Sequence, residues 1–153
     1  ATVWRNVTPT FIYKAIHGMP IPLENSGVAT RDFIYVDDIC RGLIACSIKG
    51  NAGDVYNLAS GMETTIAQLA ETIVELTKSK SKIDYLPKRA WDNSGKRYGS
   101  VSKSKENLGF EARIDHKVGL KQTIEWTLAN QALIQQNMQK HKENMKAVGA
   151  DNY

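Results

Sequence analysis

Residues 30–46 read TRDFIYVDDICRGLIAC, and the change from a strand-like to a helix-like pattern within this stretch decides the fold. Residues 33–36 are apolar or aromatic, which is typical of a short β-strand, and the two aspartates that follow suit the start of a helix running to about Ile48. A glycine-containing turn precedes Arg31, so the pattern brings a guanidinium to a loop–strand junction. Such a fork suits bidentate capture of phosphate oxygens, and an ordinary surface ion pair is the alternative.

Strand and helix patterns alternate outward from this stretch. Thr65 and Gln68 have the spacing of a capping box, and the apolar residues after them recur at helical intervals. Two prolines exclude residues 19–23 from a central strand, so an extended loop or an edge is expected there. Strands are expected at residues 33–36, 54–59 and 82–86, and helices at residues 8–17, 37–48 and 102–108, from Thr65 onward and from Asp115 onward, with fraying beyond Lys140. The prediction is an α/β fold with too few strands for an independent doubly wound sheet, so partner strands are expected on sequence outside this chain.

Length and composition exclude several classes of protein. The 153 residues correspond to one domain, and 42% hydrophobic with 24% charged residues is inconsistent with a disordered or collagenous chain. No apolar run reaches the roughly 18 residues of a membrane span. Cys40 and Cys46 lack metal-ligand spacing, which disfavours zinc modules and disulfide frameworks and favours a reducing cytoplasm. The first residues contain neither an initiator methionine nor a signal peptide, so we expect a chain cut from a longer one.

Positive charge is concentrated in residues 78–105, which hold nine Lys and Arg against two Asp. Nucleic acid, an anionic membrane, one small polyanionic ligand and a merely solvated lysine-rich surface are the possible explanations. The segment contains Pro87 and Gly95 and is expected to be mostly loop, which disfavours the first two. Within it, Arg89 and Asp92 stand three residues apart, a spacing that suits a phosphate and a ribose diol, with a surface ion pair again as the alternative.

No independent catalytic constellation is visible. The three histidines, His17, His116 and His141, are scattered and are expected at the surface. The adjacent aspartates Asp37 and Asp38 are explained by helix capping and the helix dipole. The motifs GxSxG, GxxxxGK[ST] and GxGxxG do not occur.

Four segments in a fixed order resemble the carboxy-terminal half of nucleotide-sugar epimerases and dehydratases, in the extended short-chain dehydrogenase/reductase family. The resemblance runs from about Val7 to Thr127. After the opening VTPTFIYKAIHGMPIPL, the segments read TRDFIYVDDICRGLIAC, GDVYNLASGMETTIAQLAETI, RAWDNSGKRYGSVSKSKENLGF and GLKQTIEWT. The resemblance implies the carboxy-terminal part of that fold, helices with a few short strands, with most of the Rossmann half absent.

The resemblance also implies roles for individual residues. Arg31 and Arg89 match positions that contact the pyrophosphate of a nucleoside diphosphate sugar, and Asp92 matches one that contacts the ribose. Pro22 and Leu23 lie in the loop that passes the base. The family's glycine-rich dinucleotide loop and its Tyr-x-x-x-Lys pair are missing, since no tyrosine here is followed by lysine four residues on. We therefore expect no catalytic residue and no metal site in this chain, with NAD bound mainly by an amino-terminal half.

These implications combine into one expectation of function. Residues 1–134 form the nucleotide-sugar-binding part of an NAD-dependent epimerase or dehydratase, similar to a UDP-sugar 4-epimerase, and residues 135–153 form a carboxy-terminal helix and frayed tail. The chain is expected to be inactive without its amino-terminal half. The full-length enzyme is expected to be a homodimer in the cytoplasm that acts in polysaccharide biosynthesis. The alternatives are a non-catalytic binding or assembly module, whose terminal helix packs on a partner, and a binder of anionic polymers.

Overall fold

The computed structural model describes residues 6–88, 90 and 95–147. In these ranges the chain is rich in helix and poor in strand, as predicted for a helix-rich α/β protein. Its elements, in order, are α1 Val7–Ile16, β1 Ile21–Leu23, the 3₁₀ turn η1 Glu24–Gly27, β2 Thr30–Arg31, α2 Val36–Lys49, β3 Thr64–Thr65, α3 Ile66–Thr77, β4 Ile83–Tyr85, α4 Ser102–Leu108, α5 His116–Ala129 and α6 Gln131–Ala147. None of the helices in the described ranges is long and apolar enough to cross a bilayer.

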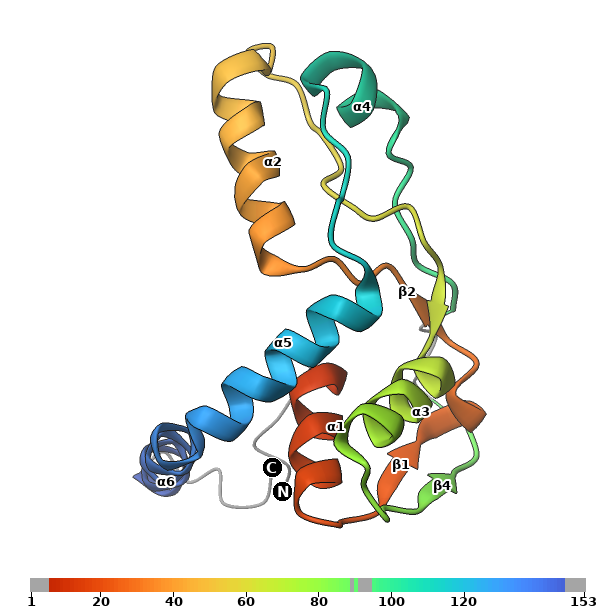
Figure 1. Cartoon of the computed structure of the whole chain (residues 1–153), viewed down its shortest axis with the longest axis vertical. Helices are drawn as coiled ribbons and strands as arrows, with labels where there is room; N and C mark the ends of the chain where they lie inside the picture. Colours follow the sequence, from red (N-terminus) through yellow and green to blue (C-terminus); the bar gives the residue numbers. More distant parts are fainter. Residues whose placement is uncertain (1–5, 89, 91–94, 148–153) are drawn as a thin grey trace.

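The hydrophobic core lies where α1, α3, α5 and β1 meet (Figure 1). Ile12 of α1, Leu69 and Ile73 of α3 and Leu23 of β1 are completely buried in it. The predicted capping box at the start of α3 is confirmed, because Thr65 Oγ accepts the Gln68 N–H at 3.0 Å and Gln68 Oε1 accepts the Thr65 N–H at 2.9 Å. The amphipathic pattern that predicted α3 therefore also predicted which of its faces is buried.

The strands form two small sheets. β1 pairs in parallel with β4, with Ile21 opposite Ile83, and β2 pairs antiparallel with β3, with Arg31 opposite Thr64. Every strand of a two-stranded sheet is an edge, so Pro22 is tolerated in β1 although it cannot donate a hydrogen bond. The prediction of an edge near residues 19–23 and of a strand near 82–86 is thus confirmed.

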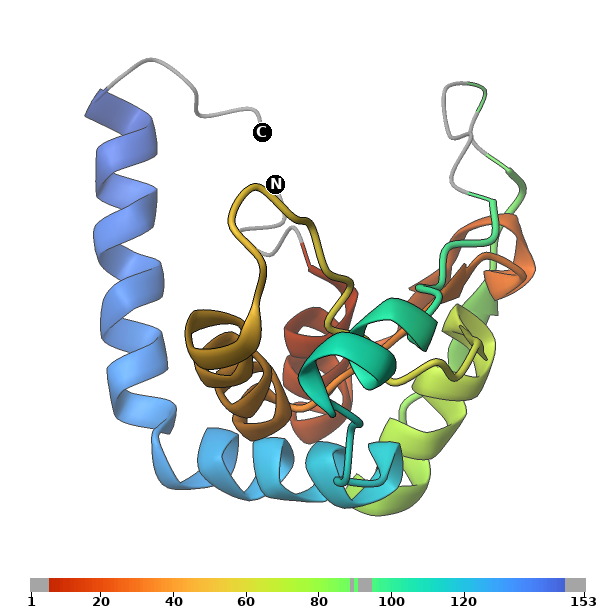
Figure 2. The ribbon, with the colours of Figure 1, turned by 90° about the horizontal axis from the view of Figure 1, so that it is seen from above.

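Helices α2 and α4 lie side by side, away from the core (Figures 1 and 2). A buried aspartate holds this pair to the rest of the fold. Asp38 is fully buried, binds the Arg41 guanidinium, and accepts the backbone N–H groups of Arg113 and Ile114 at 2.9 Å each. Asp38 therefore does more than cap a helix, because it fixes the segment that leads into α5.

Two predicted strands are wrong. Residues 33–35 form no ladder, and Val36 already belongs to α2, because Phe33 stacks on His116 and Tyr35 packs against α5. Residues 54–59 are extended, but no described strand lies beside them, and Val55 is 80% exposed. Both segments have strand-like composition, yet a strand requires a partner, which composition cannot supply.

The carboxy-terminal region contains two helices, α5 and α6, and α6 begins at Gln131, before the terminal helix expected from residue 135. Asp115 caps α5 by accepting the N–H of Lys117 at 2.9 Å, as its position suggested. The helix ends at Asn130, whose side chain donates to the Trp126 carbonyl at 2.8 Å, and α6 then leaves at a sharp angle (Figure 2). α6 runs to Ala147, beyond the expected onset of fraying at Lys140.

Candidate functional site

Arg31 is the last residue of β2 and lies beside residues 95–97, which belong to the basic segment 78–105. Its Nη1 donates to the Thr30 carbonyl at 2.6 Å and to the Gly95 carbonyl at 3.2 Å. Among the described residues, no acceptor takes a bond from its Nε or Nη2. Arg31 is half-buried. Since both of these bonds involve Nη1, the described residues anchor the guanidinium through one nitrogen and leave its other donors available to an anion.

Asp32, the neighbour of Arg31, faces another loop. One of its carboxylate oxygens accepts the Ser60 N–H at 2.8 Å and the Ser60 hydroxyl at 2.6 Å, and the other accepts the Gly61 N–H at 2.9 Å. Because adjacent side chains of extended backbone point to opposite sides, this carboxylate does not neutralise Arg31. The tether between Asp32 and Ser60 was not predicted from the sequence.

Thr30 joins three segments that are far apart in the sequence. Its side chain is 3% exposed, and its hydroxyl donates to Glu63 Oε1 at 2.7 Å. The backbone N–H of Arg97 approaches both the hydroxyl oxygen and the carbonyl oxygen of Thr30 at 3.3 Å. One buried threonine therefore connects β2 with Glu63, just before β3, and with the backbone of Arg97.

The remaining predicted site residues are placed as follows. Pro22 is half-buried in β1, whereas the Leu23 side chain is completely buried in the core and its carbonyl accepts the Leu86 N–H at 2.9 Å. The Leu23 side chain therefore cannot make an apolar contact with a ligand in this arrangement. Arg89 and Asp92 lie outside the described residues.

Several lysines of the basic segment have acidic partners elsewhere. Lys103 pairs with Asp54 at 3.0 Å, and Lys105 with Glu111 at 2.7 Å, both near the α2–α4 pair. Lys96 lies 3.8 Å from Glu63, beside Thr30. Exposed pairs of this kind contribute little to stability because water and salt screen them, so part of the local positive charge is balanced at the surface.

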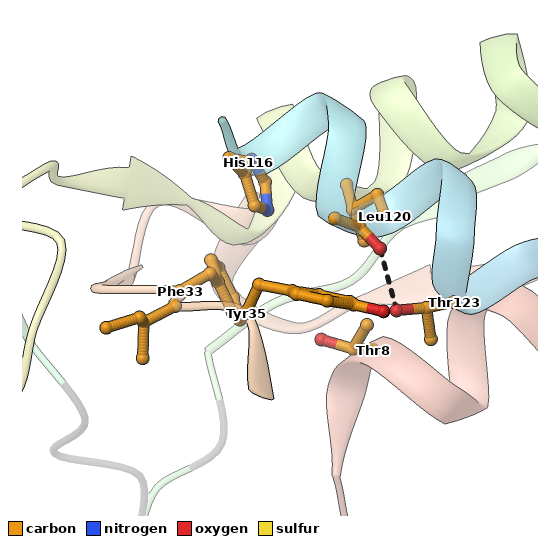
Figure 3. Close-up of a pocket in the computed structure, with 8 residues that line it drawn as sticks. Thr8, Phe33, Tyr35, His116, Leu120 and Thr123 are labelled. Atoms are coloured by element: carbon orange, nitrogen blue, oxygen red, sulfur yellow. Dashed lines mark hydrogen bonds between the residues drawn. The ribbon is translucent and has the colours of Figure 1, made fainter. Parts of the chain in front are cut away.

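A small pocket lies between the end of the Arg31 segment and α5 (Figure 3). Its volume is about 90 Å³, and its lining includes Phe33, Tyr35, His116 and Thr123. Figure 3 shows the Tyr35 ring reaching across the pocket toward Thr123. Gly119 makes this possible, because a Cβ at that position would lie only 2.9 Å from the Tyr35 ring.

His116 is not the surface residue that its sequence context suggested. Its ring stacks on Phe33 with centroids 5.3 Å apart, and its Nε2 is buried with no hydrogen-bond partner among the described residues. Burial lowers the pKa of His116 below its usual value of 6.5, and the charge of Asp115 opposes this only in part. The neutral imidazole is therefore the form that the fold favours.

Two comparisons identify sequence relatives of this chain. Residues 2–59 match the family model described as the NAD dependent epimerase/dehydratase family. The human dTDP-D-glucose 4,6-dehydratase is 31% identical over 81% of this chain, and the zebrafish (Danio rerio) UDP-glucuronic acid decarboxylase 1 is 34% identical over 78%. The chain covers 37% and 28% of those two enzymes, so it spans well under half the length of these curated relatives.

Solved structures show the same fold. WbmF from Bordetella bronchiseptica, in a complex with NAD⁺ and UDP, is 60% identical over 93% of this chain, with a TM-score of 0.82. UDP-glucose 4-epimerase from Thermotoga maritima, with UDP-glucose, is 30% identical over 82%, with a TM-score of 0.76. The chain covers 42% and 40% of those structures.

Proposed function

Because this chain belongs to the NAD-dependent epimerase/dehydratase family, we propose that it forms the nucleotide-sugar-binding part of such an enzyme, with a UDP-sugar as the substrate. The observation that carries the proposal is the position of Arg31. Its guanidinium is anchored on the carbonyl groups of Thr30 and Gly95, and Gly95 follows Asp92 by three positions in the sequence. The contact between Arg31 and Gly95 supports the proposal that the segment with Arg31 and the segment with Arg89 and Asp92 bind one pyrophosphate together.

The role of these residues is to bind and orient. A charge-assisted hydrogen bond from an arginine to a phosphate oxygen stabilises the bound state by about 1.5–3 kcal/mol. Two arginines on one pyrophosphate would hold the attached sugar in a single position, and Asp92 would accept hydrogen bonds from the ribose hydroxyls. Fixing the sugar in this way is the contribution that a binding half makes to catalysis.

Uridine is the base that the comparisons favour. The WbmF structure, with 60% identity, is a complex with UDP, and the Thermotoga epimerase was solved with UDP-glucose. Relatives near 30% identity include dehydratases of dTDP-glucose and a UDP-glucuronic acid decarboxylase, all acting on nucleoside diphosphate sugars. We assign this chain to UDP-sugars and, within them, to a 4-epimerase-like reaction.

NAD supplies redox chemistry at the sugar in our proposal, and it is held outside this chain. The sequence contains no GxGxxG motif, and the described residues present no strand, glycine-rich turn and helix unit that could cradle a pyrophosphate of NAD. The residues present do not fit the cofactor, so the reaction itself is assigned no step on this chain.

Titration calorimetry tests the proposal. We expect the 153-residue chain to bind UDP saturably, UMP more weakly and uridine weakest, because each lost phosphate removes arginine contacts. Affinity for UDP should fall only modestly between 50 and 200 mM salt, roughly as expected for a ligand with two phosphates, whereas a polymer binder would lose orders of magnitude. Equal affinities for UDP and uridine, or no binding of either, would contradict the proposal.

A further inference from the structure

Thr30 is buried next to Arg31, where its hydroxyl contacts Glu63 and the backbone of Arg97. A buried hydroxyl needs a partner for its proton and for its lone pairs. Glu63 accepts the hydrogen bond of the Thr30 hydroxyl at 2.7 Å. The hydroxyl oxygen is then free to accept the Arg97 N–H, at 3.3 Å. The Glu63 carboxylate therefore orients the Thr30 hydroxyl, and this hydroxyl in turn holds the backbone at Arg97.

The same residue also anchors Arg31. The Thr30 carbonyl accepts Arg31 Nη1 at 2.6 Å, and the second acceptor of that nitrogen is Gly95, two residues before Arg97. β2 itself is held by β3, with Thr30 opposite Thr65 and the Ile66 N–H donating to the Ala29 carbonyl at 2.9 Å. Any movement of residues 95–97 away from Thr30 would separate the Gly95 carbonyl from the Arg31 guanidinium.

We propose that Thr30 and Glu63 are positioning residues for nucleotide-sugar binding, which act by fixing the Arg31 guanidinium and the 95–97 segment relative to each other. This inference rests on the proposed function, since it assumes that Arg31 contacts the pyrophosphate. Glu63 is suited to the task because its carboxylate carries the charge that a buried hydroxyl binds most strongly. Its 3.8 Å contact with the exposed Lys96 adds little.

Calorimetric titration of the full 153-residue chain with UDP tests the inference. Thr30→Val keeps the shape of the side chain but removes both hydroxyl bonds, and we expect UDP affinity to fall about fivefold, the equivalent of one hydrogen bond. Thr30→Ser keeps the hydroxyl and should stay within about twofold of the parent chain. Thr72→Val is the matched control, because its hydroxyl bonds only to the Gln68 carbonyl inside α3, at 2.8 Å.

A double-mutant cycle separates positioning from general destabilisation. If Thr30 acts through Arg31, Thr30→Val should cost no further affinity in the Arg31→Ala background. An additive loss in that background, or unchanged affinity in Thr30→Val alone, would overturn the inference. If Arg31→Ala itself leaves UDP affinity unchanged, the proposed function fails first, and the inference fails with it.

Glu63 keeps the proposal testable if Thr30→Val does not fold. Glu63 is exposed enough to accept substitution, so Glu63→Leu should fold while it removes the acceptor of the Thr30 proton. We expect Glu63→Leu to weaken UDP binding about as much as Thr30→Val. Glu63→Gln keeps an acceptor oxygen and should lie between Glu63→Leu and the parent chain. Parent-like affinity in Glu63→Leu would contradict the inference.

Discussion

Arg31 is the side chain whose removal should cost the most affinity. Arg31→Ala is expected to weaken UDP binding by about 1.5–3 kcal/mol, tenfold or more, because the charge-assisted phosphate contacts are lost. Arg31→Lys should recover only part of this, since one ammonium cannot reproduce a guanidinium fork. Titration calorimetry measures both, and Arg113→Ala is the control, because the backbone N–H that Arg113 gives to Asp38 survives the substitution. Parent-like affinity of Arg31→Ala would remove Arg31 from the site.

His116 should make stability depend on pH. Burial lowers its pKa in the folded chain below 6.5, so on acidification the unfolded chain takes up the proton first. Stability should therefore be lost as the pH falls from about 6.5 toward the folded-state pKa, and this contribution should be constant above about pH 7. His116→Phe removes the buried nitrogen and should shrink the difference in Tm between pH 5 and pH 7. His141→Gln, on α6, should leave that difference in place, and an equal change in both variants would contradict the assignment.

Among single residues, the sequence singles out Arg31 as the candidate anion-binding group but does not reveal the residues that hold it in place. Arg31 stands out because a turn, a strand-like run and a helix start surround it. Asp32, Asp38 and Glu63 carry no such signal, since their partners lie 28 to 76 positions away in the sequence. A carboxylate that binds distant backbone N–H groups looks, in one sequence, like any other surface acid.

The turn η1 between β1 and β2 depends on a glycine. Gly27 has a φ of +69°, and a Cβ there would lie 2.8 Å from the Ala67 backbone nitrogen on α3. Gly27→Ala should destabilise the chain by about 2–4 kcal/mol, from the strained backbone together with the clash. Gly18→Ala is the matched control, because Gly18 has a φ of +65° but nothing within 4 Å of its Cβ position, so only about 1 kcal/mol is expected. Chemical denaturation measures both, and equal losses would show that the contact with α3 is unimportant.

Helices were more predictable than strands at the level of elements. Two independent patterns predict α3, its capping box and its apolar spacing, and α4 occupies the predicted residues 102–108. β2 and β3 are two residues long and exist only because they pair with each other. Residues 33–36 look more like a strand than either, but their aromatic rings pack on α5 instead.

At the scale of the whole molecule, an apolar face of α2 is left uncovered by the described residues. Leu43, Ile44 and Ile48 of α2 are 58%, 58% and 74% exposed, and Val55 nearby is 80% exposed. Apolar faces of this kind promote association. We expect the purified chain to associate in a concentration-dependent way, and Leu43→Lys combined with Ile48→Lys to reduce that association.

Sedimentation velocity over a range of concentrations measures this effect. The double variant Leu128→Lys, Leu133→Lys is the control, since these side chains are also about half exposed but lie on α5 and α6. Its association should match that of the parent chain. A monomeric parent chain, or equal effects of both double variants, would show that the α2 face is not the adhesive one.

The pairing of β1 with β4 has a consequence for how the chain folds. Leu23 and Tyr85 are neighbours in the sheet although 62 positions separate them, and each strand has only three residues. Bringing such distant segments together costs chain entropy before any of the short ladder is gained, so this contact cannot nucleate folding. Each of the helices α1 and α3 is held by local hydrogen bonds and should form early, and β4 should join β1 late. The polypeptide between these strands includes Thr30, Arg31 and Glu63, so the anion site that we propose is completed only when the loop between β1 and β4 has closed.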